Sequence, residues 1–253
     1  MDTLSTMRTA EQGGGIAVLA KAFQVLDALT DEKPESVSQL ANALDLPRTT
    51  VHRILQTLTS QEVLTPSLQP GPKLIRWALA ALNVGGIREA SGPVLDRLVE
   101  AFGETASVFV RSGSTRTCIA RREGTEQIRH SLSIGMSIPL HVGSGGRILL
   151  AWVPSDERKR LIRESQSVSG APVVEPDGGW QAIREKGWAI TMGERDPVLA
   201  SISVPVYDPD GRVVAALSLS GPRMRFSDRR ASEMATQLKT EAQILGAQIE
   251  RGA

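Results

Sequence analysis

The chain has 253 residues and a net charge of +1, and its 41% hydrophobic content is enough for one large or two modest domains. Aromatic residues make up only 4%, so the cores must consist mainly of Leu, Val, Ile and Ala. The single cysteine, Cys118, excludes an internal disulfide framework and favours a reducing, cytoplasmic location. No apolar run reaches the length of a membrane span and no signal peptide is evident, so we expect no membrane partner.

The first residues divide into a polar tail and an amphipathic segment. Residues 1–15 end in three consecutive glycines, which predicts a disordered N-terminal arm. Apolar residues then recur at helical spacing over 16–30, which predicts a helix that packs on the next two helices. The apolar residues of this predicted stripe are Leu19, Ala22, Phe23, Leu26 and Leu29.

The stretch from Ser36 to Leu58 predicts two helices joined by a turn. Ser36 and Gln39 have the spacing of a capping box, and Pro47 suits the first turn of the second helix because it needs no backbone donor there. Over Pro47–Ser60 the apolar residues form one stripe, and the opposite face has no carboxylate. We therefore predict a helix-turn-helix whose recognition helix meets phosphates and base edges in the major groove. The candidate DNA-binding residues are Arg48, Thr49, Thr50, His52 and Arg53.

The charge of this N-terminal segment argues against DNA binding. Residues 1–77 contain seven basic and eight acidic residues, so their net charge is −1. A DNA-binding domain without net positive charge must gather its cations on one face, and a dimer would double its contacts. The charge therefore leaves open an alternative, a ligand-sensing dimerisation module without direct DNA binding.

The segments after the recognition helix predict a wing and a linker. Residues 63–65 and 73–75 flank the turn PSLQPGP, which predicts the hairpin of a winged helix. Helical patterns over 75–84 and 87–102 are interrupted by two glycines. We therefore predict a DNA-binding domain at 16–76, a linker helix at 77–90 and a second domain at 91–253.

The second domain mixes strands and helices. Hairpin turns are expected at Ser112-Gly113-Ser114 and at Asp208-Pro209-Asp210-Gly211, so the strands should be antiparallel and the fold α+β. The predicted strands are 106–110, 117–121, 128–134, 188–192, 200–207 and 213–220. The predicted helices are 147–152, which follows a glycine-rich loop at 141–147, and then 156–163, 180–186 and 231–250.

Taken together, these segments resemble the IclR family of bacterial transcriptional regulators over about residues 19–226. The resemblance rests on LAKAFQVLDAL, SVSQLANALDLPRTTVHRILQTL, IPLHVGSGGRILLA, IREKGWAITMGE and SVPVYDPDGRVVAALSLSGP. It implies a winged helix-turn-helix, a linker helix and a GAF-like effector-binding domain with an antiparallel sheet and flanking helices. It also implies homodimers, often paired into tetramers, on a palindromic operator in double-stranded DNA. The sequence departs from the family pattern at Arg147, usually a lysine, at Pro197-Val198 and at Ile75-Arg76-Trp77.

The resemblance places a small effector, often a carboxylate or aromatic acid, between the glycine-rich loop and the central strands. Backbone N–H groups at a helix N-terminus bind anions, and serines that alternate with leucines share one strand face. Glu194 would repel an anion unless it points away. The candidate effector-binding residues are Ser144, Gly145, Thr191, Glu194, Ser201, Ser218 and Ser220.

Two other interpretations of this region remain open. The serines could be small strand residues satisfied by backbone or water. Trp152, Trp180 and Trp188 could line a site for an aromatic ligand, although tryptophan at such spacing is more often part of a core.

An enzyme is the third class of function. Cys118 could act as a nucleophile with His130 or His141 as base, but its strand-like setting favours a buried structural thiol. Ser144 lies in GSGG, which is not the nucleophile elbow G-x-S-x-G. The three histidines lack metal-ligand spacing, so we expect no catalytic site, metal or cofactor. We expect His52 to face DNA and His141 to orient the glycine-rich loop, in a regulator that acts as a repressor.

Overall fold

The computed structural model describes residues 16–31, 34, 36–74, 76–77, 86–126 and 133–249, which form two compact units, Met1–Leu82 and Asn83–Ala253. The predicted arm, most of the predicted linker helix and most of the predicted strand 128–134 lie outside the described residues. No helix in the described part of the chain is both long and apolar enough to cross a membrane.

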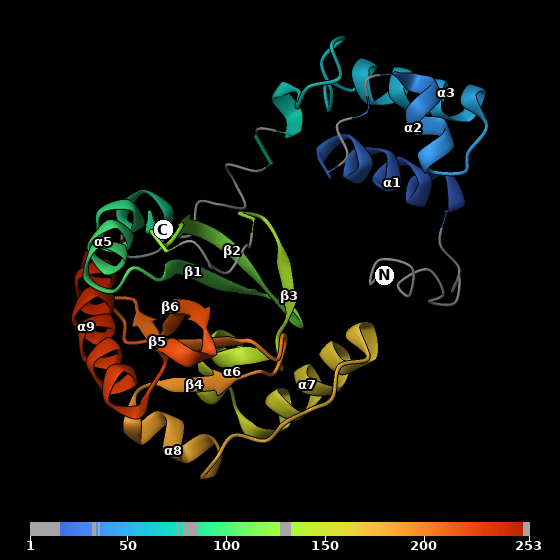
Figure 1. Ribbon diagram of the computed structural model, residues 1–253. Coiled ribbons are helices and arrows are strands. Elements are labelled where there is room, and N and C mark those ends of the chain that lie inside the picture. The colour runs from blue at the N-terminus through green and yellow to red at the C-terminus, as the bar shows by residue number, and fades with distance from the viewer. Residues whose placement is uncertain are drawn as a thin grey trace. The chain divides into compact units, whose positions relative to one another are not determined.

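The first unit contains the predicted helix-turn-helix (Figure 1). Its helices are α1 (Ala17–Asp31), α2 (Val37–Ala43) and α3 (Arg48–Ser60). Ser36 caps α2 as predicted, because its Oγ accepts a hydrogen bond of 3.2 Å from the Gln39 N–H. The turn passes through Asp45, whose φ of 51° lies in the left-handed region that Asp tolerates.

The face of α1 that packs on the core overlaps the predicted stripe only in part. Val25 and Ala28 are buried against α2 and α3, whereas Leu19 and Phe23 are more than half exposed. The predicted stripe is therefore correct for Ala22, Leu26 and Leu29, which pack against this core, and wrong for Leu19 and Phe23. On α3, Val51, Ile54 and Leu55 are buried as predicted.

The predicted wing is only partly correct. A single β-bridge joins Leu64 to Pro70, and residues 72–74 are already helical. The predicted second strand at 73–75 is therefore wrong at residues 73 and 74, and residue 75 lies outside the described residues.

The second unit is built on one six-stranded antiparallel sheet in the order β3-β2-β1-β6-β5-β4. This sheet and its covering helices confirm the predicted α+β fold. The strands are β1 (Thr105–Ser112), β2 (Thr115–Arg122), β3 (Ser137–Pro139), β4 (Ala189–Met192), β5 (Leu199–Tyr207) and β6 (Val213–Pro222).

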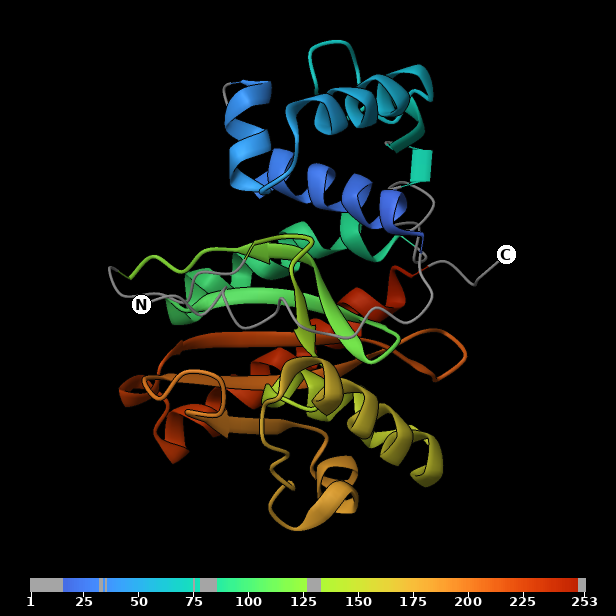
Figure 2. The same ribbon diagram turned by 90° about the vertical axis from the view of Figure 1, so that its right-hand side faces the viewer.

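Helices cover both faces of the sheet, so the central strands are buried on both sides (Figures 1 and 2). Helices α5 and α9 lie on one face, and α6 packs on the other against β4, β5 and β6. Figure 2 shows α7 in front of the sheet and α9 behind it. The helices are α5 (Ile87–Phe102), α6 (Gly143–Ala151), α7 (Ser155–Ser169), α8 (Gly179–Lys186), η2 (Arg223–Arg225) and α9 (Asp228–Ala247).

Helix α6 begins earlier than predicted. The glycine-rich segment was expected to be a loop before Arg147, but α6 starts at Gly143 and every one of its residues is buried. Gly146 lies directly against the Leu140 carbonyl, where a Cβ would overlap the carbonyl oxygen. The glycines therefore let the helix start within the core.

This close approach predicts a large loss of stability for Gly146→Ala. The added methyl group must push α6 away from Leu140, which should cost about 3 kcal/mol of unfolding free energy or more. Denaturant unfolding followed by tryptophan fluorescence measures this change.

The matched control is Gly92→Ala in the interior of α5. A Cβ at Gly92 meets only the Arg122 Nη2 at 3.5 Å, an ordinary contact. Alanine should therefore stabilise the unit by about 0.5–1 kcal/mol. Equal effects of the two substitutions would contradict the assignment of Gly146 as a packing glycine.

Candidate functional site

The exposed face of α3 carries most of the predicted DNA-binding residues. Arg48, Thr49, His52 and Arg53 are exposed, and Thr50 is half-buried. The first turn of α3 contains no acidic residue, and the positive end of the helix dipole lies beside Arg48. This face can therefore attract phosphate oxygens and offer donors to base edges.

Thr50 does not share the fully exposed face. Together with Arg53 it borders a groove whose other wall is formed by Ile16, Val18 and Leu19. Of the five predicted DNA-binding residues, Thr50 is the half-buried one, and Arg53 borders the same groove but stays exposed.

In the second unit, all seven predicted effector-binding residues line one cavity between α6 and the sheet. Strand register explains part of this convergence, since Ser201 pairs with Ser220 and Ser203 pairs with Ser218 across β5 and β6. The sequence-based prediction omitted several other residues of this cavity. They are Phe109, Arg116, Ile138, Gly143, Arg195, Asp196, Leu199 and Ala200.

A chain of hydroxyl groups joins the start of α6 to three strands. The Ser144 Oγ lies 2.8 Å from the Ser201 Oγ and 2.6 Å from the Ser203 Oγ. The chain continues from Ser203 to Ser218 at 2.7 Å and from Ser201 to Thr191 at 3.0 Å. These buried hydroxyls satisfy one another, as buried polar groups generally do.

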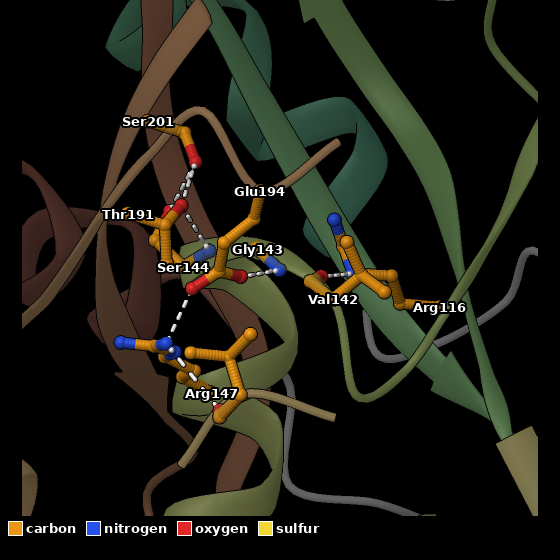
Figure 3. Close-up of polar contacts among 9 residues, drawn as sticks. Arg116, Val142, Gly143, Ser144, Arg147, Thr191, Glu194 and Ser201 are labelled. Carbon is orange, nitrogen blue, oxygen red and sulfur yellow. Dashed lines mark hydrogen bonds and ion pairs between the residues drawn. The ribbon is translucent and has the colours of Figure 1, made fainter. Parts of the chain in front are cut away.

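Glu194 faces the start of α6 rather than pointing away from it (Figure 3). The Gly143 N–H donates to Glu194 Oε2 at 2.7 Å, and the Ser144 N–H donates to Thr191 Oγ1 at 3.1 Å. Two of the N–H groups expected to bind an anion therefore already have partners in the protein.

Arg147 holds this carboxylate in place. Its Nη2 donates to Glu194 Oε1, and the side chains of Arg147 and Glu194 are only 9% and 13% exposed. The arginine that departs from the family's lysine is thus one half of a largely buried ion pair. The pair fixes the β4–β5 loop on the first turn of α6.

Arg116 approaches the same turn from β2 (Figure 3). Its Nη1 donates to the carbonyls of Val142 and Pro139, the latter at 2.9 Å, and its guanidinium stacks 5.3 Å from the Phe109 ring centre. The sequence holds one signal for Arg116. It lies two residues before Cys118, so along a strand the two side chains share the face on which a buried thiol is expected.

The pKa of Arg116 is lowered to about 9, chiefly by burial and then by the nearby charge of Arg195, against the opposing effect of Glu194. The group is still cationic at neutral pH. A buried cation therefore lines the cavity, and its charge is costly to keep away from water.

His141 anchors the chain just before α6. Its ring nitrogens lie 2.8 Å from the Ser165 Oγ and 3.1 Å from the Ala171 carbonyl oxygen. Burial lowers the pKa of His141, so its neutral form is favoured. These contacts agree with the predicted orienting role; His130 lies outside the described residues.

The three tryptophans lie outside the cavity. Trp152 meets Tyr207 edge to face, Trp180 lies under Arg158 and Trp188 lies under Lys186. The aromatic residue that lines the cavity is Phe109 instead.

Comparisons with known proteins agree with this architecture. Residues 79–246 match the family described as bacterial transcriptional regulator IclR C-terminal, and residues 18–66 match the IclR helix-turn-helix domain. The chain is 32% identical to the HTH-type transcriptional regulator BhcR of Paracoccus denitrificans, over 89% of this chain and 84% of that protein. It is 28% identical to the regulator KdgR of Escherichia coli, over 94% and 95% of the two chains.

A solved structure has the same fold. The crystal structure of the Thermotoga maritima IclR superposes with a TM-score of 0.67 at 24% identity, covering 92% of this chain and 98% of that one. These names describe transcriptional regulators rather than enzymes.

The Glu194–Arg147 contact predicts the effect of Glu194→Gln. Removing the charge leaves Arg147 largely buried without its carboxylate, which should cost about 3 kcal/mol of unfolding free energy. Glu157→Gln is the control, because Glu157 pairs with Arg111 at 3.4 Å on the surface and should cost less than about 1 kcal/mol. Denaturant titration compares the two, and equal losses would argue against the role of Glu194.

The environment of Cys118 predicts an unreactive thiol. Cys118 is fully buried, and burial raises its pKa to about 11, so at pH 8 the thiol stays protonated. Alkylation by iodoacetamide should be at least about 100-fold slower in the folded protein than in 6 M guanidinium. Mass spectrometry measures the rate, and fast labelling of the folded protein would reopen the nucleophile hypothesis.

Proposed function

The chain belongs to the IclR family of bacterial transcriptional regulators, and we propose that it binds operator DNA through α3 and responds to a small effector held beside α6. The observation that supports the DNA contact most is the carboxylate-free exposed face of α3 beside its N-terminus. Because only two arginines stand on that face, we propose a cytoplasmic homodimer, or a tetramer, on a palindromic double-stranded operator.

Each residue of α3 has a distinct part in this proposal. Arg48 and Arg53 supply contacts to phosphates or guanines. Thr49, Thr50 and His52 are candidates for base edges, with Thr50 contributing least because it is half-buried.

The effector part of the proposal is supported by the cavity at the start of α6. Seven residues from α6, β4, the β4–β5 loop, β5 and β6 converge there, and the hydroxyl chain gives it several hydrogen-bonding groups. An effector changes DNA binding only if it binds one arrangement of the two units better than another. We propose repression that is relieved by the effector.

Arg53→Ala tests the DNA-binding assignment. The substitution removes one guanidinium, so affinity for the DNA upstream of the protein's own gene should fall about tenfold. A mobility-shift titration over a salt series should also give a shallower salt dependence than for the unmodified protein.

Arg229→Ala is the control, since Arg229 lies on α9 and its side chain is 91% exposed. It should leave the mobility shift unchanged. An Arg53→Ala protein that is folded and binds as tightly as the unmodified one would exclude α3 as the recognition helix. No shift at all at low salt would favour the ligand-sensing module.

A further inference from the structure

Arg116 is the most unusual side chain in the cavity. It is a charged residue with only 6% exposure, and it lies across the first turn of α6. Cβ atoms placed on Gly143 and Gly145 would come within 3.1 Å of its Nη2 and 3.3 Å of its Nε. The glycine-rich sequence therefore makes room for this guanidinium as well as for the start of the helix.

One edge of the guanidinium is hydrogen-bonded, and the other has no hydrogen-bond partner among the described residues. Nη1 donates to two backbone carbonyls, which fixes the plane of the group. Nε is buried without a hydrogen-bond partner among the described residues, and Nη2 likewise has no hydrogen bond there. The Nε–H and Nη2–H pair is the edge that binds a carboxylate in a bidentate manner.

The surrounding charges leave a positive excess. Arg116, Arg147 and Arg195 gather around the start of α6, whereas the carboxylates there are Glu194 and Asp196. Arg147 already pairs with Glu194, and no described carboxylate forms an ion pair with Arg116. The N-terminal end of the α6 dipole adds partial positive charge. A single negative charge would balance this group.

We propose that Arg116 is a specificity-determining residue of the effector site and that it selects a monocarboxylate through its unpaired Nε–Nη2 edge. The acid group lies on Arg116, and the apolar remainder of the ligand lies against Phe109, Ile138 and Leu199, which also line the cavity. This inference rests on the proposed effector site and adds to it the residue that binds the acid group.

The contacts of Arg116 favour this role over a purely structural one. A buried ionic group is normally paired with the opposite charge, as Glu104 is with the partly buried Arg225. Arg116 instead has two neutral carbonyls on one edge and no acceptor on the other. Burying an unpaired guanidinium edge lowers the stability of the folded protein. Because the group is already fixed in place, the same edge is preorganised to bind an anion.

The test compares acids with their uncharged amides on the full-length protein. Propionate and benzoate, with propionamide and benzamide as neutral analogues and succinate as a dianion, are added at 20 mM and constant ionic strength. The monocarboxylates should raise the thermal midpoint by about 2 °C or more, while the amides and succinate should not. Calorimetry then measures the affinity of the better acid.

Three variants separate a ligand contact from a structural one. Arg116→Met should abolish the response while its unliganded midpoint equals or exceeds that of the unmodified protein. Arg116→Lys keeps the charge but loses the planar fork, so acid affinity should fall at least about tenfold. Arg212→Met is the matched control, because Arg212 is exposed in the β5–β6 turn and should leave the response intact.

The outcomes distinguish this inference from the proposed function. Equal shifts with acids and amides, no shift with any acid, or a full response in Arg116→Met would each overturn the role of Arg116. A lower unliganded midpoint in Arg116→Met would assign it to structure instead. Mobility shifts on the same proteins test operator binding independently of the acid response. Operator binding without an acid response would overturn only the role of Arg116. An acid response without operator binding would overturn the proposed regulator function.

Discussion

The second unit depends on burying the first turn of α6. A helix start exposes backbone N–H groups that have no partner within the helix, and here water cannot reach them because all of α6 is buried. Glu194 accepts from the Gly143 N–H, Thr191 accepts from the Ser144 N–H, and Arg147 neutralises the carboxylate. The same contacts hold β4 and the β4–β5 loop in place. The cavity is therefore a consequence of how the protein satisfies a buried helix end.

The sequence predicts this site well where periodicity decides the outcome. Ser201 and Ser220 are on the cavity side because strand residues alternate faces, and hairpin register then pairs them across β5 and β6. It fails where single contacts decide. Glu194 lies at the predicted site, but its contacts with Arg147 and the Gly143 N–H are not visible in a pattern of residue types. The role of Arg116 depends equally on carbonyl groups that only the fold brings near.

The first unit shows the same division. The apolar stripe of α3 is strong enough to fix its buried face, whereas α1 has apolar residues almost all round, so spacing alone could not choose between Leu19 and Val25. The prediction of the wing is partly wrong, and local backbone contacts are involved. Gly71 packs against the Glu62 backbone, where any Cβ would overlap the carbonyl oxygen. Backbone contacts of this kind leave no periodic signal.

The effector site also limits how a ligand could act on the rest of the chain. Glu194 is already neutralised by Arg147, so an anion gains most by approaching Arg116 and need not displace Glu194. Arg116 belongs to β2, and β2 packs against α5, the first helix of this unit. A ligand bound to Arg116 would thus contact the strand on which α5 packs. Its effect on DNA binding equals the difference in its affinity for the two arrangements of the units, so a rigid β2 would bind the acid without transmitting anything.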